Sequence, residues 1–359
     1  MTDTPPPAVS ILMAAYNGAA WVGATIDSLL EQSFRDFELI VVDDASTDDT
    51  LARLCAIADP RLVILPSQRN GGPIAARNRA FAAARGRYIA GLDQDDLCLP
   101  ERLERQVAYL DAHPDVVVLG TAMRDLLDDG RIVDDLSTPA LTSPCLLAWA
   151  MHFYNPLGWS TVMMRGDALR RLPVFERPER LYAEDFDLYH RLAKLGAIAR
   201  IDTPLMLYRR HAASASQRFT ERMTDSATAV LAETYRPIFG PRAAAAARRV
   251  LTQGSGYAPV RSCAELAELG RILARVHEHF LREYRPAGAD LALVRQEYAR
   301  FWWTIAHRAI RAGRVTIPAA LRARPAGVAL GAVPPARLMM AGLIGGGRAL
   351  KAFWATRDA

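Results

Sequence analysis

The sequence lacks the features that mark secreted, disulfide-stapled and membrane-spanning proteins. Its four cysteines, Cys55, Cys98, Cys145 and Cys263, are scattered, with neither a metal-type spacing nor a disulfide framework. No segment reaches about 18 uninterrupted apolar residues, the length that a membrane-spanning helix needs. Residues 1–7 have neither the basic stretch nor the apolar run of a secretory signal. These absences predict a cytoplasmic protein, and 359 residues are enough to bury a large core.

Charge is distributed unevenly along the chain. The formal net charge is +5, but residues 1–240 contain 25 Lys+Arg and 32 Asp+Glu, a balance of −7, whereas residues 241–359 contain 19 and 7, a balance of +12. The basic part also carries apolar and aromatic runs such as Phe301-Trp302-Trp303. Helices of this composition can lie in a membrane interface, attracted by anionic lipid. A helical appendage whose apolar face packs on the rest of the protein, with Arg facing solvent, is an equally good interpretation. Nucleic acid is a poorer explanation, because no nucleic-acid motif accompanies the basic residues.

Strand and helix patterns alternate through the first hundred residues. Apolar runs predict strands at residues 9–15, 37–42, 62–65 and 86–92, with helical patterns between them. Asn17 is expected to cap the first helix, and Gly71-Gly72-Pro73 to open the third. The resulting order, β-α-β-α-β-α-β, predicts an α/β fold with a mostly parallel sheet flanked by helices. Ligands of such sheets bind beyond the carboxyl ends of the strands.

Two clusters of carboxylates are the main candidates for function. Asp93-Gln94-Asp95-Asp96 follows an apolar strand, and Glu184-Asp185 comes about 90 residues later. An acidic strand end suits a hard divalent cation, and a second carboxylate suits the general base of a group transfer. Taken alone, a D-x-D is more often a solvated turn, and acids also favour the first turn of a helix. Five polar residues nevertheless fall at predicted strand ends, so one cleft is expected to hold Asn17, Asp43, Asp44, Asp93 and Asp95.

The order and spacing of these motifs resemble those of family 2 glycosyltransferases. The resemblance covers roughly residues 8–216 and rests on five stretches: Val9–Asn17, Phe37–Thr50, Ala76-Arg77-Asn78, Ala90–Asp96 and Glu184–Leu188. It implies an inverting, nucleotide-sugar-dependent enzyme with the GT-A fold, a Rossmann-like α/β architecture. Two departures from the family pattern are Ala14-Ala15, where many relatives carry Pro-Thr or Pro-Ser, and Gln94, where a small residue is commoner.

The resemblance also implies roles for the candidate residues on the donor side. Asp95 is the implied direct ligand of Mn²⁺ or Mg²⁺, and Asp93 belongs to the same implied metal site while facing the ribose and donor sugar. His211, which Ser214 and Ser216 follow, can complete the metal shell. Arg77 is the implied basic residue near the nucleotide. The wall that holds the base and ribose of the donor is expected to comprise Ala14, Tyr16, Asn17, Asp43 and Asp44.

On the acceptor side, the resemblance implies Asp185 as the catalytic base, with Glu184 before it. Trp159 lies in the segment that faces the acceptor in the family. Its ring could stack on a sugar or pack in the interior, and the sequence leaves both open.

The expected layout is a catalytic domain at residues 8–216 and a helical extension at residues 217–359, with long helices at Ala264–Tyr284 and Ala289–Ala312. The expected function is transfer of a sugar from a UDP-, GDP- or dTDP-linked donor to a glycan or lipid-linked acceptor, in cell-surface polysaccharide synthesis. The expected location is the cytoplasm, at the inner face of the membrane if the basic tail binds it. The alternative is a catalytically silent scaffold of the same fold. A Q-x-x-R-W motif, typical of processive synthases, is missing, as is the Gly-rich loop of nucleotidyltransferases.

Overall fold

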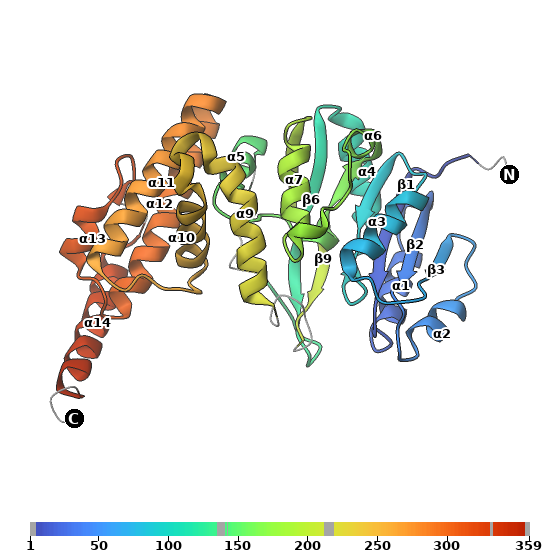
Figure 1. The fold of residues 1–359 in the computed structure, drawn as a ribbon, viewed down its shortest axis with the longest axis horizontal. Coiled ribbons are helices and arrows are strands. Elements are labelled where there is room, and N and C mark those ends of the chain that lie inside the picture. The colour runs from blue at the N-terminus through green and yellow to red at the C-terminus, as the bar shows by residue number, and fades with distance from the viewer. Residues whose placement is uncertain (1–4, 135–140, 142, 212–218, 331–332, 356–359) are drawn as a thin grey trace. The chain divides into compact units, whose positions relative to one another are not determined.

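The computed structural model describes residues 5–134, 141, 143–211, 219–330 and 333–355, and these form two compact units (Figure 1). Unit 1 comprises Met1–Leu147 and Asn155–Ser226, and unit 2 comprises Ala148–Tyr154 and Ala227–Ala359. Unit 1 holds the sheet and every candidate site residue that the structure describes. Ser214 and Ser216 lie outside the described residues.

Unit 1 is built on a nine-stranded sheet among the described residues. Its strands are β1 (Val9–Ala15), β2 (Phe37–Asp43), β3 (Leu62–Pro66), β4 (Tyr88–Gly91), β5 (Leu97–Cys98), β6 (Val116–Leu126), β7 (Ile132–Asp134), β8 (Met163–Arg165) and β9 (Ala197–Arg209). Its helices are α1 (Val22–Leu30), α2 (Thr50–Cys55), α3 (Pro73–Ala83), α4 (Arg102–Ala112), α5 (Pro144–Ala150, which continues into unit 2), α6 (Gly166–Arg170) and α7 (Glu184–Leu192). Two short 3₁₀ helices, η1 (Trp159–Thr161) and η2 (Pro178–Arg180), complete the unit.

The first half of the sheet is parallel, as the alternating pattern predicts. Its strands lie in the order β3-β2-β1-β4, with Val9 opposite Phe37 and Ala15 opposite Asp43. Beyond β4 the sheet is mixed: β8 is antiparallel to both β4 and β6, β9 is parallel to β6, and β5 is antiparallel to β9. The carboxyl ends of β1, β2 and β4 therefore meet at one edge, the edge at which ligands of such sheets bind.

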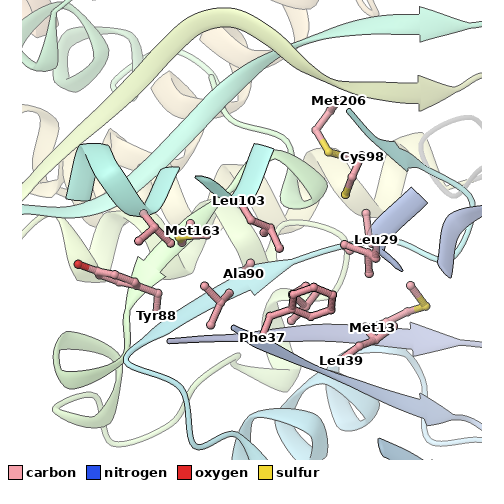
Figure 2. Close-up of a cluster of buried hydrophobic side chains, with 14 of the residues drawn as sticks. Met13, Leu29, Phe37, Leu39, Tyr88, Ala90, Cys98, Leu103, Met163 and Met206 are labelled. Atoms are coloured by element: carbon pink, nitrogen blue, oxygen red, sulfur yellow. The ribbon is translucent and has the colours of Figure 1, made fainter. Parts of the chain in front are cut away.

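The parallel half is held by a buried apolar cluster (Figure 2). Met13, Leu39 and Ala90 project into it from β1, β2 and β4, while Leu29 and Leu103 reach it from α1 and α4. Strands covered on both faces read as continuous apolar runs, which explains why these segments were recognisable in the sequence.

Asn17 does not cap the first helix, so that prediction is wrong. Helix α1 begins at Val22 with Trp21 at its N-cap, and the amide of Trp21 donates to the carbonyl of Gly18 in an intervening turn. Asn17 instead adopts a left-handed backbone (φ 49°), and its Oδ1 accepts from the amide of Thr47 at 2.8 Å. The side chain thus joins the loops after β1 and β2.

Unit 2 is helical. It contains the larger part of α9 (Thr220–Phe239), then η3 (Gly240–Arg242), α10 (Ala243–Ser255), α11 (Cys263–Tyr284), α12 (Gly288–Arg311), α13 (Ile317–Ala323) and α14 (Pro335–Ala355). The two predicted long helices are confirmed as α11 and α12. Ser262 caps α11 by accepting from the amide of Glu265 at 3.2 Å. No helix in the described ranges is both long and apolar enough to cross a membrane.

Gly91, at the end of β4, generates a stability prediction. A Cβ added there would lie 2.6 Å from both Cε2 and the carbonyl oxygen of Trp159. Gly91→Ala should therefore lower the free energy of unfolding by about 1–3 kcal/mol, the usual cost of overpacking, measured by urea denaturation. Gly23 on α1 has open space around it, so Gly23→Ala is the matched control and should stabilise by up to about 1 kcal/mol. Equal effects of the two substitutions would contradict this account of Gly91.

Candidate functional site

The first carboxylate cluster is attached to the end of β9. Asp96 Oδ1 accepts from the amide of Arg209 at 3.0 Å, and Arg209 Nε donates to the carbonyl of Asp95 at 2.9 Å. These two bonds place the residues that follow Arg209 next to the D-x-D. As a result, His211 Nε2 lies 2.8 Å from Asp95 Oδ2, although the two residues are 116 positions apart. Asp95 and His211, two of the predicted metal-site residues, therefore lie in contact with each other.

Asp95 and His211 have the donor chemistry that a divalent cation requires. A carboxylate oxygen with an imidazole nitrogen suits Mn²⁺, and the carboxylate suits Mg²⁺. The part of the chain that the structure describes contains no group of three or more His, Cys, Asp or Glu placed to hold a metal alone. The pair thus fits a cation that takes its remaining ligands from water or from phosphate oxygens of a bound molecule.

Gln94, in the middle of the D-x-D, connects it to the turn after β1. Its Oε1 accepts from the amide of Tyr16 at 2.9 Å, and its Nε2 donates to the carbonyl of Tyr16 at 3.1 Å. The contact needs Gly18, because a Cβ there would lie 2.1 Å from Gln94 Oε1. The two bonds fix the backbone of Tyr16, two residues after Ala14, while the ring of Tyr16 is exposed to solvent. Gln94 departs from the pattern of the family that the sequence resembles, but the sequence gives no hint of this contact.

Asp43 and Asp44, at the end of β2, are both buried. The carboxylate of Asp44 accepts from the amides of Gly71 at 2.9 Å and Gly72 at 2.7 Å, so it fixes the loop that opens α3. Gly72 has a φ of 84°, a conformation that glycine adopts without strain. Asp43 accepts from the amide of Ser46 through Oδ2, whereas its Oδ1 is buried with no partner in the described structure. Asp44 therefore fixes the start of α3, whereas one carboxylate oxygen of Asp43 is left without a hydrogen bond among the described residues.

Arg77, on α3, brings the two carboxylate clusters together. Its buried guanidinium donates to Glu176 Oε2 at 3.0 Å through Nε and to Glu184 Oε1 through Nη2, and its Nη1 lies 3.9 Å from Asp93 Oδ1. The same group covers the ring of Trp159 at 4.9 Å from the ring centre. Arg77 thus lies between the acids, at the centre of the site, where the resemblance had implied only a position near the nucleotide.

Trp159 is packed in the interior. Its residue surface is 6% exposed, and its Nε1 is buried without a hydrogen-bond partner in the described ranges. One face of the ring is covered by Arg77, and Gly91 leaves room for its edge. This placement matches the packing alternative, because little of the ring is open to a sugar in this conformation.

Glu184 and Asp185 begin α7, where the helix dipole favours acids. Asp185 Oδ2 accepts from Asn155 Nδ2 at 2.9 Å. Burial, and next the Glu184 carboxylate, raise the pKa of Asp185 to about 7. Asp187 instead pairs with Arg191 at 2.7 Å and has a structural role. Asp185 is therefore the carboxylate of this cluster suited to accept a proton near neutral pH.

Glu176 is a residue of the site that sequence reasoning missed. It is fully buried, and its backbone makes two bonds with Asn78: Asn78 Nδ2 donates to its carbonyl and its amide donates to Asn78 Oδ1, both at 2.9 Å. Burial raises the pKa of Glu176 to about 8 against the opposing effect of Arg77. An isolated acid in a loop carries no sequence motif that marks it as a site residue. The only indirect signal is the Arg77-Asn78 dipeptide, because both of its side chains bind Glu176.

Comparison with known proteins gives a family match over this part of the chain. Residues 10–161 match the family model described as Glycosyl transferase family 2. The chain is 35% identical over 194 residues to the putative glycosyltransferase EpsE of Bacillus subtilis. The aligned region covers 53% of this chain and 68% of EpsE. The chain is also 31% identical over 225 residues to WfaP of Escherichia coli, which is named as a UDP-Glc:alpha-D-GlcNAc-diphosphoundecaprenol beta-1,3-glucosyltransferase. This aligned region covers 61% of this chain and 84% of WfaP.

Among solved structures, TarS 1-349 of S. aureus in complex with UDP-GlcNAc is similar in fold. The TM-score is 0.53 and the sequence identity 18%, over 93% of this chain and 90% of that chain. At this identity the similarity shows the fold alone.

The raised pKa of Glu176 predicts how a substitution depends on pH. Between the usual value of 4.5 and about 8, the folded chain binds this proton more tightly than the unfolded chain, so the Glu176 contribution to stability falls as pH rises. Glu176→Gln should match the wild type near about pH 5 and become the more stable of the two toward about pH 8, measured by urea denaturation across pH. Glu31→Gln, at an exposed position, is the control. A stability difference that does not change with pH would refute the assignment.

Proposed function

The chain belongs to glycosyltransferase family 2, and from this membership and its GT-A fold we propose an inverting, metal-assisted transfer of a sugar. The donor is a nucleoside-diphosphate sugar, and the acceptor is a hydroxyl of a glycan or of a lipid-linked saccharide. The name of the relative WfaP describes a UDP-linked donor and a diphosphoundecaprenol acceptor, which supports this class of substrates and a role in cell-surface polysaccharide synthesis.

The single observation that carries the proposal is the meeting of both acid clusters at Arg77. Asp93 belongs to the D-x-D and Glu184 adjoins the candidate base, and both lie against one guanidinium in unit 1. A donor-side carboxylate and an acceptor-side base must lie near the same anomeric carbon, and the shared contact of Asp93 and Glu184 with Arg77 supports such an arrangement. A scaffold without chemistry has no need of it, so the geometry favours the transferase.

Asp185 performs the proton transfer in this proposal. The acceptor hydroxyl attacks the anomeric carbon, its proton passes to the Asp185 carboxylate, and the bond from carbon to the diphosphate oxygen breaks. Attack from the face opposite the leaving group inverts the anomeric centre. A positioned base of this kind contributes about 10²–10⁴-fold to the rate. Asn155 keeps the carboxylate in place by donating to Oδ2.

Asp95 and His211 are the residues that would hold a divalent cation, Mn²⁺ or Mg²⁺. When bound, the cation neutralises negative charge on the departing nucleoside diphosphate. Asp93 faces the ribose and donor sugar in this proposal. The wall for the base and ribose comprises Ala14, Tyr16, Asn17, Asp43 and Asp44. The loop shaped by Asp44 and the turn fixed by Gln94 give that wall a defined form before the donor arrives.

Replacing Asp185 by Asn tests the base. The amide cannot accept the proton and would face the amide of Asn155, so transfer should fall by at least about 10²-fold while donor binding stays within about twofold. In the wild type, kcat/KM should rise with pH through about 7, because Asp185 acts only when deprotonated.

Radiolabelled sugar transfer and donor titration measure the two effects of Asp185→Asn. Glu179→Gln, an exposed acid of the neighbouring η2, is the matched control and should transfer normally. Near-normal turnover in Asp185→Asn would eliminate Asp185 as the base.

Replacing Asp95 by Ala tests the donor and the cation together. UDP-, GDP- and dTDP-sugars are screened by thermal shift, each with Mn²⁺ and with EDTA. One nucleotide class should raise Tm by about 5–10 °C at about 100 times its Kd, only with the metal, and the rise should vanish in Asp95→Ala. Asp128→Ala, at an exposed position, should keep it. If no nucleotide sugar shifts Tm, the silent-scaffold alternative is favoured.

A further inference from the structure

The end of the chain has an extreme charge composition. Between Glu297 and Asp358 the sequence contains no acidic residue and ten basic ones: Arg300, Arg308, Arg311, Arg314, Arg322, Arg324, Arg337, Arg348, Lys351 and Arg357. This segment includes most of α12 and all of α13 and α14. Arg300 pairs with Glu297 at the edge of the segment, and the excess of the other basic residues produces a positive field that attracts anionic surfaces.

Helix α14 is seated on unit 2 through small residues. Ala341 is buried, and a Cβ on Gly345 would lie 2.0 Å from the carbonyl oxygen of Ile310 in α12. A Cβ on Gly342 would lie 2.8 Å from Ile317 Cδ1 in α13. This close contact fixes the rotation of α14 about its axis, and with it the direction in which the opposite face points.

The opposite face of α14 is apolar and exposed. Met339, Met340, Leu343 and Ile344 are 61%, 60%, 75% and 36% exposed, and their spacing places them on one side of the helix. Elsewhere in the described ranges, exposed large apolar side chains occur singly along the chain, which is ordinary. Four together form a patch of the kind that marks an interaction surface. Figure 1 shows α14, coloured red, projecting beyond the other helices of unit 2.

We infer that this face of α14, the residues Met339, Met340, Leu343 and Ile344 flanked by Arg337 and Arg348, docks on an anionic lipid bilayer. A bilayer of this kind supplies both an apolar phase for the four side chains and negative charge for the exposed arginines beside them. A helix with one face packed against protein and the other exposed lies in the plane of the interface, in keeping with the finding that no described helix can cross a membrane.

A second copy of the chain is a poorer occupant of the same face. Dimerisation through α14 would bring two acid-free, basic segments together, and like charges at close range are destabilising. The charge thus selects a negative partner. The inference goes beyond the proposed transfer reaction and does not depend on it, because the residues of the face lie in unit 2 and those of the site in unit 1.

Vesicle flotation of the full-length protein tests the inference. Wild type should bind vesicles of phosphatidylcholine with ~30% phosphatidylglycerol far better than phosphatidylcholine alone, and should lose that binding as salt is raised. Met340→Gln with Leu343→Gln should weaken binding by at least about tenfold, because the apolar contribution is removed. Arg337→Gln with Arg348→Gln should weaken it by roughly 25-fold, about fivefold for each charge.

Two double substitutions in unit 1 serve as controls. Val63→Gln with Ile132→Gln removes two exposed apolar residues, and Arg53→Gln with Arg222→Gln removes two exposed charges. Both should bind vesicles like the wild type. Donor-induced thermal shifts should be the same in all four double variants, which separates failure of membrane binding from failure of the proposed transfer.

Three results would overturn the inference. One is a wild type that binds no vesicle, and another is a Met340→Gln, Leu343→Gln variant that binds as the wild type does. The third is a lipid-free dimer, detected by sedimentation, that this variant dissociates, since the face would then belong to a second copy.

Discussion

A buried guanidinium organises the catalytic unit. A charge inside a protein is strongly destabilising unless it is paired, and breaking a buried pair leaves an uncompensated charge. Arg77 meets this requirement by pairing with Glu184 and by donating a hydrogen bond to Glu176, and its Nη1 lies 3.9 Å from Asp93 Oδ1. The helix α3, the end of β4 and the start of α7 are therefore held in one arrangement. The donor side and the acceptor side of the proposed site cannot move independently while these pairs persist.

The same arrangement leaves the site rich in negative charge. Asp95 and Asp96 lie beside the acids that Arg77 holds, and Asp185 follows Glu184 directly. A nucleoside diphosphate approaching such a surface is repelled unless a cation intervenes, and this is the physical support for proposing a metal at Asp95 and His211. The raised pKa of Asp185 has the same origin, because burial and a neighbouring carboxylate both disfavour its ionised form.

The parallel half of the sheet, its acidic strand ends and the two long helices of unit 2 were predictable, because each rests on a local pattern. Apolar runs bounded by turns indicate buried strands, and the acids of Asp93 and Asp95 follow one directly. The rest depends on contacts between distant residues. Gln94 binds Tyr16 across 78 positions, and Glu176 binds Arg77 across 99. The strand β8, three residues long, is too short to show a period, and its antiparallel pairing with β4 and β6 joins segments that are far apart in the sequence.

The contact between Gln94 and the turn after β1 couples two positions that are far apart in the sequence. Gln94 occupies the space that any side chain at residue 18 would need, and it holds the backbone of Tyr16 in return. A larger residue at position 18 would displace the end of the Gln94 side chain and break its two hydrogen bonds to Tyr16, and shortening residue 94 would remove the same bonds. A substitution at either position therefore changes the effect of a substitution at the other, so residues 18 and 94 are expected to be epistatic.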